Sequence, residues 1–157
     1  MKIGIIGPSK VNDKEKITEV AKIIANSGHE IIIVPHKKSS SEFFGQEYIK
    51  YGGKKVYSIV PLEDTEYGFD YLNLNIGEQI NCGIWRESAR RLNKETDALL
   101  CLGYASGVLI EIGYTKWIKP KPVYIIKELV SVKLPKEFDN RLDLRYVSIK
   151  GIGKKLN

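Results

Sequence analysis

Two glycine-containing turns in this sequence carry residue types that are suited to binding a small anion. They read Gly7-Pro8-Ser9-Lys10 and Gly103-Tyr104-Ala105-Ser106-Gly107, and each lies between an apolar run and a stretch with helical spacing. Backbone N–H groups at such a turn, with a helix N-terminus behind them, favour a phosphate group. The ligand-binding residues predicted from the two turns are Gly7, Pro8, Ser9, Gly103, Tyr104, Ser106, Gly107 and Val108.

Two charged residues near the second turn are the candidates for catalysis. Glu111 falls in the first turns of the helix that follows it, among apolar neighbours. A carboxylate at that position is able to act on a ligand held by the turn. Arg86 begins the helix before the preceding strand, so it is expected to reach the same place. The alternative for both is a solvated surface side chain.

Other signatures of chemistry are not found in the sequence. Neither turn matches the Gly-x-Gly-x-x-Gly dinucleotide fingerprint or a Walker loop, so a plain connecting role for the turns stays open. His29 and His36 have no cysteine or carboxylate at ligand spacing, and we expect no metal site and no bound cofactor. Cys101 lies inside an apolar run and is predicted to be a core residue.

Apolar runs that alternate with amphipathic stretches indicate the elements that position these residues. Strands are predicted over residues 2–6, 30–34, 55–60, 98–102 and 122–126, with an edge strand over 145–149 and a polar tail. Helices are predicted over residues 13–27, 39–51, 85–94 and 108–117. Residues 61–81 are expected to form an irregular loop, with at most a short strand at 71–74. This order predicts an α/β fold with an open, mostly parallel sheet and helices on both faces.

The composition is that of one globular domain spanning residues 1–157. Hydrophobic residues make up 43% and charged residues 28%, and no apolar run approaches the roughly 18 residues that cross a bilayer. Two cysteines, and an N-terminal apolar run too short for a signal peptide, favour a reduced cytoplasmic location. We expect no contact with a membrane.

The positive charge is concentrated in the C-terminal third. Of the net charge of +6, residues 113–157 contribute 11 basic and 4 acidic side chains, or +7, which leaves −1 for the rest. A basic region can attract nucleic acid. These lysines are scattered without interleaved aromatic residues, however, so a solvated surface is favoured and nucleic-acid binding is not expected.

Several short runs together resemble a known superfamily. They are Trp-Arg-Glu-Ser-Ala-Arg at residues 85–90, Asp-Ala-Leu-Leu-Cys-Leu-Gly at 97–103 and Gly-Val-Leu-Ile-Glu at 107–111, preceded by Gly-Gly-Lys and a strand ending in proline at 52–61. Their order is similar to that in the LOG-type, lysine decarboxylase-like phosphoribohydrolases. It is also similar to that in the molybdenum-cofactor carrier proteins and in the DNA-processing protein DprA. The resemblance implies a single-domain Rossmann-like fold.

The resemblance also implies three functions. The first, which we favour, is binding of a nucleotide or phosphorylated ribose at the carboxyl end of the sheet. The second is hydrolysis of the N-glycosidic bond of a nucleoside 5′-monophosphate, in which Glu111 stabilises the sugar cation or orients water and Arg86 holds phosphate or assists the departing base. Val108 replaces the threonine of the family loop, which places binding ahead of catalysis. The third is binding of single-stranded DNA, as in DprA.

A homodimer is the expected assembly. The resemblance implies an oligomer, and aromatic residues on three predicted helices point the same way. Residues 43–51 carry Phe43, Phe44, Tyr48, Ile49 and Tyr51, while Trp85 and Trp117 lie on two further helices. Because a helix on a sheet buries one stripe, some of these side chains are expected to remain exposed on a monomer.

Overall fold

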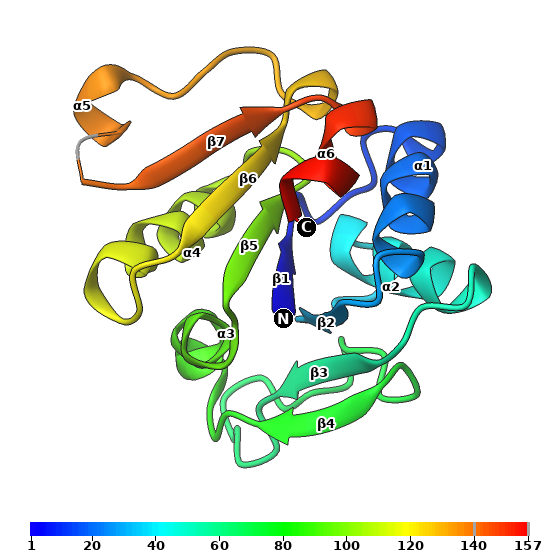
Figure 1. The fold of residues 1–157 in the computed structure, drawn as a ribbon. Coiled ribbons are helices and arrows are strands. Elements are labelled where there is room, and N and C mark those ends of the chain that lie inside the picture. Colours follow the sequence, from blue (N-terminus) through cyan, green and yellow to red (C-terminus); the bar gives the residue numbers. More distant parts are fainter. Residues whose placement is uncertain (140, 157) are drawn as a thin grey trace.

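The computed structural model describes residues 1–139 and 141–156, and within them seven strands form one sheet (Figure 1). All neighbouring strands pair in parallel, in the order β4-β3-β2-β1-β5-β6-β7. The strands are β1 Lys2–Ile6, β2 Glu30–Ile33, β3 Val56–Val60, β4 Glu78–Asn81, β5 Ala98–Cys101, β6 Pro122–Ile126 and β7 Asp143–Val147. The predicted open parallel sheet is confirmed.

Helices cover both faces of the sheet, as predicted (Figure 1). One face packs against α1 (Lys14–Ala25), α2 (Ser40–Lys50) and α6 (Ile149–Leu156). The other packs against α3 (Ser88–Glu95) and α4 (Ser106–Trp117). Shorter helices are η1 (Trp85–Glu87), η2 (Lys127–Leu129) and α5 (Lys136–Asp139). No helix among the described residues is long and apolar enough to cross a membrane.

The side chains of the central strand β1 alternate between two hydrophobic cores, one on each face of the sheet. Ile3 and Ile5 of β1 face α1, α2 and α6, while Ile6 faces the α3 and α4 side. Gly4 lies between Ile3 and Ile5 in the strand, and a Cβ at that position would stand 2.6 Å from Leu99 Cδ2 on the neighbouring strand β5. The glycine therefore lets the central strand approach the side chains of β5 closely.

Side-chain caps fix the starts of two helices. Asp13 accepts the N–H of Lys16 at 3.1 Å at the start of α1, and Ser39 accepts the N–H of Glu42 at 3.2 Å at the start of α2. The Glu42 carboxylate accepts the backbone N–H of Lys38, a residue in the left-handed region with a φ of 68°. Both helices are thus fixed at the ends that approach the carboxyl edge of the sheet.

Two expectations for the elements are wrong, and a third holds with shifted bounds. Residues 78–81, expected within an irregular loop, form strand β4, whereas of residues 71–74 only Leu72 makes a single antiparallel bridge, with His36. The polar tail forms helix α6, whose Ile149, Ile152 and Leu156 are buried. The edge strand at the C-terminal side exists, but it spans Asp143–Val147 and not residues 145–149.

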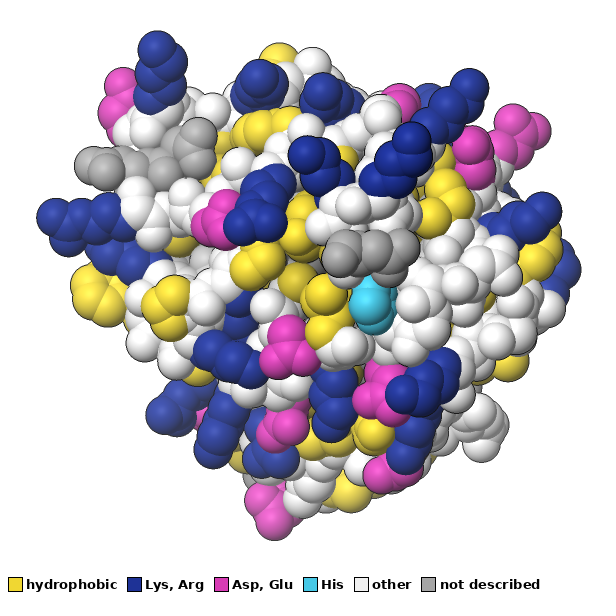
Figure 2. All heavy atoms as spheres, viewed as in Figure 1, with side chains coloured by type: hydrophobic (Ala, Val, Ile, Leu, Met, Phe, Trp, Pro, Cys, Tyr) yellow, Lys and Arg dark blue, Asp and Glu magenta, His cyan; other side chains and the backbone are white. Residues whose placement is uncertain are grey.

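Basic side chains are dispersed over the surface. On the face seen in Figure 2, lysine and arginine side chains are scattered, and in the lower half of the view they alternate with acidic ones. Within the described residues, ion pairs of the C-terminal third include Lys119 with Asp97 at 3.0 Å and Arg145 with Asp143 at 2.7 Å.

Candidate functional site

A cavity of about 560 Å³ lies at the carboxyl ends of the central strands. Strand order reverses between β1 and β5, and ligands of open parallel sheets bind at such a reversal. The cavity is formed by segments that follow β1, β2, β3 and β5 and by residues of η1, α3 and α4. Its polar and aromatic lining residues are Ser9, His36, Ser39, Ser41, Tyr71, Trp85, Arg86, Ser88, Ser106, Glu111 and Tyr114.

The two predicted turns lie side by side, and part of each lines the cavity. Gly7 and Ser9 line it from the first turn, and Ser106, Gly107 and Val108 line it from the second. Pro8, Gly103 and Tyr104 are not among its lining residues. Gly103 has a φ of 145°, and a Cβ there would lie 3.1 Å from Pro8. These two residues therefore pack the turns against each other, which brings their remaining residues to one cavity.

The N-terminus of α4 opens into the cavity without a side-chain cap. Ala105 is the N-cap residue, and among the described residues no side chain accepts a hydrogen bond from the first turn. A Cβ at Gly107 would meet no atom within 4 Å. The N–H groups at a helix start carry partial positive charge, so this exposed turn is able to bind an anion.

Glu111, the predicted catalytic carboxylate, lines the cavity one turn into α4. Its side chain is partly buried, and burial raises the pKa of Glu111 to about 8. Burial has this effect because a low-dielectric surrounding disfavours the charged carboxylate. The group therefore holds a proton at pH 7 and is able to donate a hydrogen bond to a ligand.

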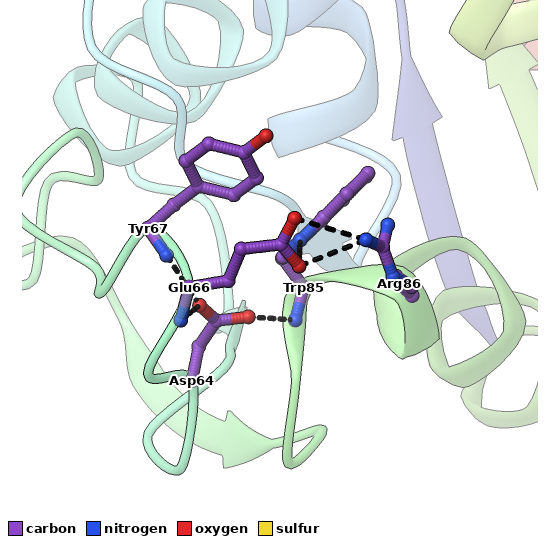
Figure 3. Close-up of polar contacts among 5 residues, drawn as sticks. All are labelled: Asp64, Glu66, Tyr67, Trp85 and Arg86. Carbon is purple, nitrogen blue, oxygen red and sulfur yellow. Dashed lines mark hydrogen bonds and ion pairs between the residues drawn. The ribbon is translucent and has the colours of Figure 1, made fainter.

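Arg86, the predicted cation, also lines the cavity but has a partner that the sequence did not indicate (Figure 3). Its Nη2 lies 2.9 Å from both carboxylate oxygens of Glu66, a residue of the loop between β3 and β4. The indole Nε1 of Trp85 donates to the same carboxylate at 3.1 Å. The guanidinium carbon lies 4.5 Å from the centre of the Trp85 ring.

The loop that carries Glu66 is fixed by a buried carboxylate. Asp64 accepts the N–H groups of Glu66, Tyr67 and Trp85 at 3.0, 2.8 and 2.7 Å (Figure 3). These bonds lower the pKa of Asp64, with the N–H of Tyr67 the largest cause. An ionised Asp64 thus joins the loop to the segment that starts η1 and positions Trp85 and Arg86 beside the cavity.

Several cavity residues were not predicted as site residues. His36, Ser39 and Ser41 follow β2, and Tyr71 comes from the loop expected to be irregular. The first three were predictable in principle, because β2 neighbours β1 and the carboxyl ends of parallel strands meet at one edge. Burial lowers the pKa of His36, which keeps its ring neutral near pH 7.

Cys101 is a core residue, as predicted. It is buried within β5, and burial raises the pKa of its thiol to about 12. A thiol with that pKa is protonated at neutral pH and does not act as a nucleophile.

Comparison with solved structures identifies the architecture. The molybdenum-cofactor carrier protein from Chlamydomonas reinhardtii matches with a TM-score of 0.78 and 17% identity, over 99% of this chain and 94% of that one. The molybdenum cofactor binding protein from the phototrophic bacterium Rippkaea orientalis matches with a TM-score of 0.74 and 18% identity, with the same coverage of each chain. This chain has the fold of the molybdenum-cofactor carrier proteins.

The match confirms the Rossmann-like fold that the resemblance of the sequence motifs implied. No family model matches the sequence, and no curated protein matches it significantly. The similarity is therefore one of architecture, and it covers 99% of this chain and 94% of each of the two matched chains.

Proposed function

We propose that this protein binds a small phosphorylated molecule with a flat heterocycle in the cavity between β1 and β5. Nucleoside monophosphates belong to this class, and so does the molybdenum cofactor, a phosphorylated pterin. The observation that carries the proposal is the uncapped N-terminus of α4, which opens into a cavity of about 560 Å³. That volume is in the range of small-molecule sites.

The start of α4 is the proposed phosphate subsite. Ser106 adds a hydroxyl, and Gly107 has no side chain to keep an anion from the backbone N–H groups. The turn after β1 adds Ser9 to the lining of the same cavity. A phosphate at a helix start gains both hydrogen bonds and the favourable helix dipole.

Aromatic side chains form the proposed subsite for the ring. Tyr71, Trp85 and Tyr114 line the same cavity, and His36 packs on Tyr71 with ring centres 4.8 Å apart. Aromatic faces stack on flat heterocycles of many kinds. The carrier and binding proteins that share this fold are named for such a ligand, which supports the same class here.

Calorimetric titration with AMP and with adenosine tests the proposal. AMP should bind and adenosine should bind at least about tenfold more weakly, because it lacks the phosphate. Gly107→Asp should weaken AMP binding by about tenfold or more through charge repulsion at the helix start. Gly113→Asp is the matched control, since it adds the same charge to α4 where an added Cβ also meets no atom within 4 Å. Equal affinity of AMP for both variants would argue against the phosphate subsite.

Glu111 supports a second candidate function, hydrolysis of a nucleoside monophosphate. In that reaction water adds to C1′ of the ribose, the bond from C1′ to the base nitrogen breaks with its electron pair on the base, and the proton that the added water loses returns to the Glu111 carboxylate. With a pKa of about 8, Glu111 holds the proton that the departing base takes up at pH 7. Release of adenine from AMP by the wild type, and its loss in Glu111→Gln, would support hydrolysis. Binding of AMP without release of adenine would support binding as the function and contradict hydrolysis.

A further inference from the structure

We infer that Glu66 competes with the ligand for Arg86 and limits how tightly a phosphate binds in the cavity. In the free protein Glu66 occupies the guanidinium, and it leaves when the ligand's phosphate takes its place. The inference rests on the proposed function, because the competing anion is the phosphate of the ligand. It makes Glu66 a residue that sets affinity and selectivity, although Glu66 is not one of the residues that line the cavity.

The atoms of the ion pair explain the competition. Only Nη2 of Arg86 contacts Glu66, and it lies 2.9 Å from both carboxylate oxygens. A guanidinium binds a phosphate through two parallel N–H bonds, from either Nε with Nη2 or Nη1 with Nη2. Nη2 belongs to both pairs. A phosphate that forms either pair therefore competes with the Glu66 carboxylate for the N–H groups of Nη2.

The pair is exposed enough to exchange. The side chain of Arg86 is 54% exposed and that of Glu66 is 46% exposed, and such surface pairs hold together weakly. A phosphate monoester near neutral pH carries close to two negative charges against the single charge of Glu66. The ligand's anion is then the stronger partner for the guanidinium, provided that the rest of the ligand is held in the cavity.

The surroundings allow the carboxylate to leave without moving the arginine. Asp64 holds the backbone of Glu66 and that of Trp85, so rotation of the Glu66 side chain is sufficient (Figure 3). Arg86 keeps its position over the Trp85 ring, 4.5 Å from the ring centre. The indole N–H loses its bond to Glu66 in the same step, which changes the environment of a fluorescent side chain beside the cavity.

Calorimetric titration of AMP into Glu66→Gln tests the inference. A neutral amide competes poorly for a guanidinium, so AMP should bind about two- to fivefold more tightly than to the wild type, while adenosine binding stays unchanged. Glu63→Gln is the matched control, because Glu63 is an exposed carboxylate of the same loop with no bond to Arg86 among the described residues. Its AMP affinity should equal that of the wild type.

A double-mutant cycle shows whether the effect acts through Arg86. In an Arg86→Gln background, Glu66→Gln should no longer tighten AMP binding. Equal or weaker AMP binding by Glu66→Gln in the wild-type background would overturn the inference while leaving the proposed function standing. The same gain in the Arg86→Gln background would overturn it too, since the effect would then be one of general charge. Failure of every protein to bind AMP would overturn the proposed function, and the inference with it.

Discussion

At the scale of single residues, Glu111 is in an environment that opposes its charge. Burial raises the pKa of its carboxyl from the usual 4.5 to about 8. Between those pH values the folded protein keeps a proton that the unfolded chain has lost. The contribution of Glu111 to stability is therefore greatest below about pH 4.5 and decreases as the pH rises to about 8.

Replacing this carboxyl by an amide should stabilise the protein in a pH-dependent way. Glu111→Gln cannot ionise, so we expect it to be more stable than the wild type by about 1–2 kcal/mol at pH 8, after allowance for partial exposure to water. At pH 5 the difference should be small. Urea unfolding of both proteins at the two pH values measures it. A stability difference that does not change with pH would show that the pKa of Glu111 is not raised.

Pairings between distant residues are the part of the site that the sequence did not predict. Arg86 and Glu111 were identified as candidates, and both line the cavity. The partner of Arg86, however, is Glu66, 20 residues earlier in the sequence, in a segment without a periodic pattern. Only the fold of that loop around Asp64 brings the two side chains together.

At the scale of elements, the apolar pattern predicts the buried strands and misses the exposed strand β4. The strands β1, β2, β5 and β6 are runs of buried apolar residues, which the sequence reveals directly. Strand β4 reads Glu-Gln-Ile-Asn and lies at an edge of the sheet with mostly exposed side chains. Its pairing with β3 depends on the parallel register of backbone groups, which leaves no apolar signature.

A buried lysine fixes the end of α3, the helix that follows Arg86. Lys121 Nζ donates to the backbone oxygens of Asn93 and Thr96 and to the Thr96 hydroxyl. Burial lowers the pKa of Lys121 to about 8. Cations near a helix C-terminus satisfy carbonyl groups that have no partner within the helix.

Removing the Lys121 side chain should lower the free energy of unfolding. Lys121→Met leaves buried carbonyl oxygens without donors, and we expect a loss of about 2–3 kcal/mol in the free energy of unfolding. The matched control is Lys119→Met, which removes an exposed ion pair with Asp97 and should cost about 0–1 kcal/mol. Urea unfolding compares the two. Equal losses for both variants would contradict the capping role of Lys121.

At the scale of the whole molecule, exposed apolar residues lie on α4 more than on α2. Phe44 and Tyr48 of α2 are fully buried, whereas Ile49 on the same helix is 52% exposed. On α4, Trp117 is 75% exposed and Ile110 is 57% exposed. Among the aromatic residues named for the dimer, Trp117 shows the predicted exposure.

The dimer stays a prediction, and α4 is the surface we expect it to use. Light scattering at micromolar concentration should give a mass near twice 17.8 kDa, because a symmetric pair would cover Trp117 and Ile110. Trp117→Glu should reduce the mass to that of one chain, whereas Ile49→Glu on α2 should leave it unchanged. A mass near 17.8 kDa for the wild type would contradict the dimer.

Phosphate binding at the start of α4 is the central claim, and a crystal structure with AMP tests it most directly. We expect the phosphate within hydrogen-bond distance of the backbone N–H groups of Ser106, Gly107 and Val108, with the adenine among the aromatic side chains of the cavity. A phosphate bound elsewhere on the molecule, or no AMP in crystals soaked at millimolar concentration, would contradict the claim.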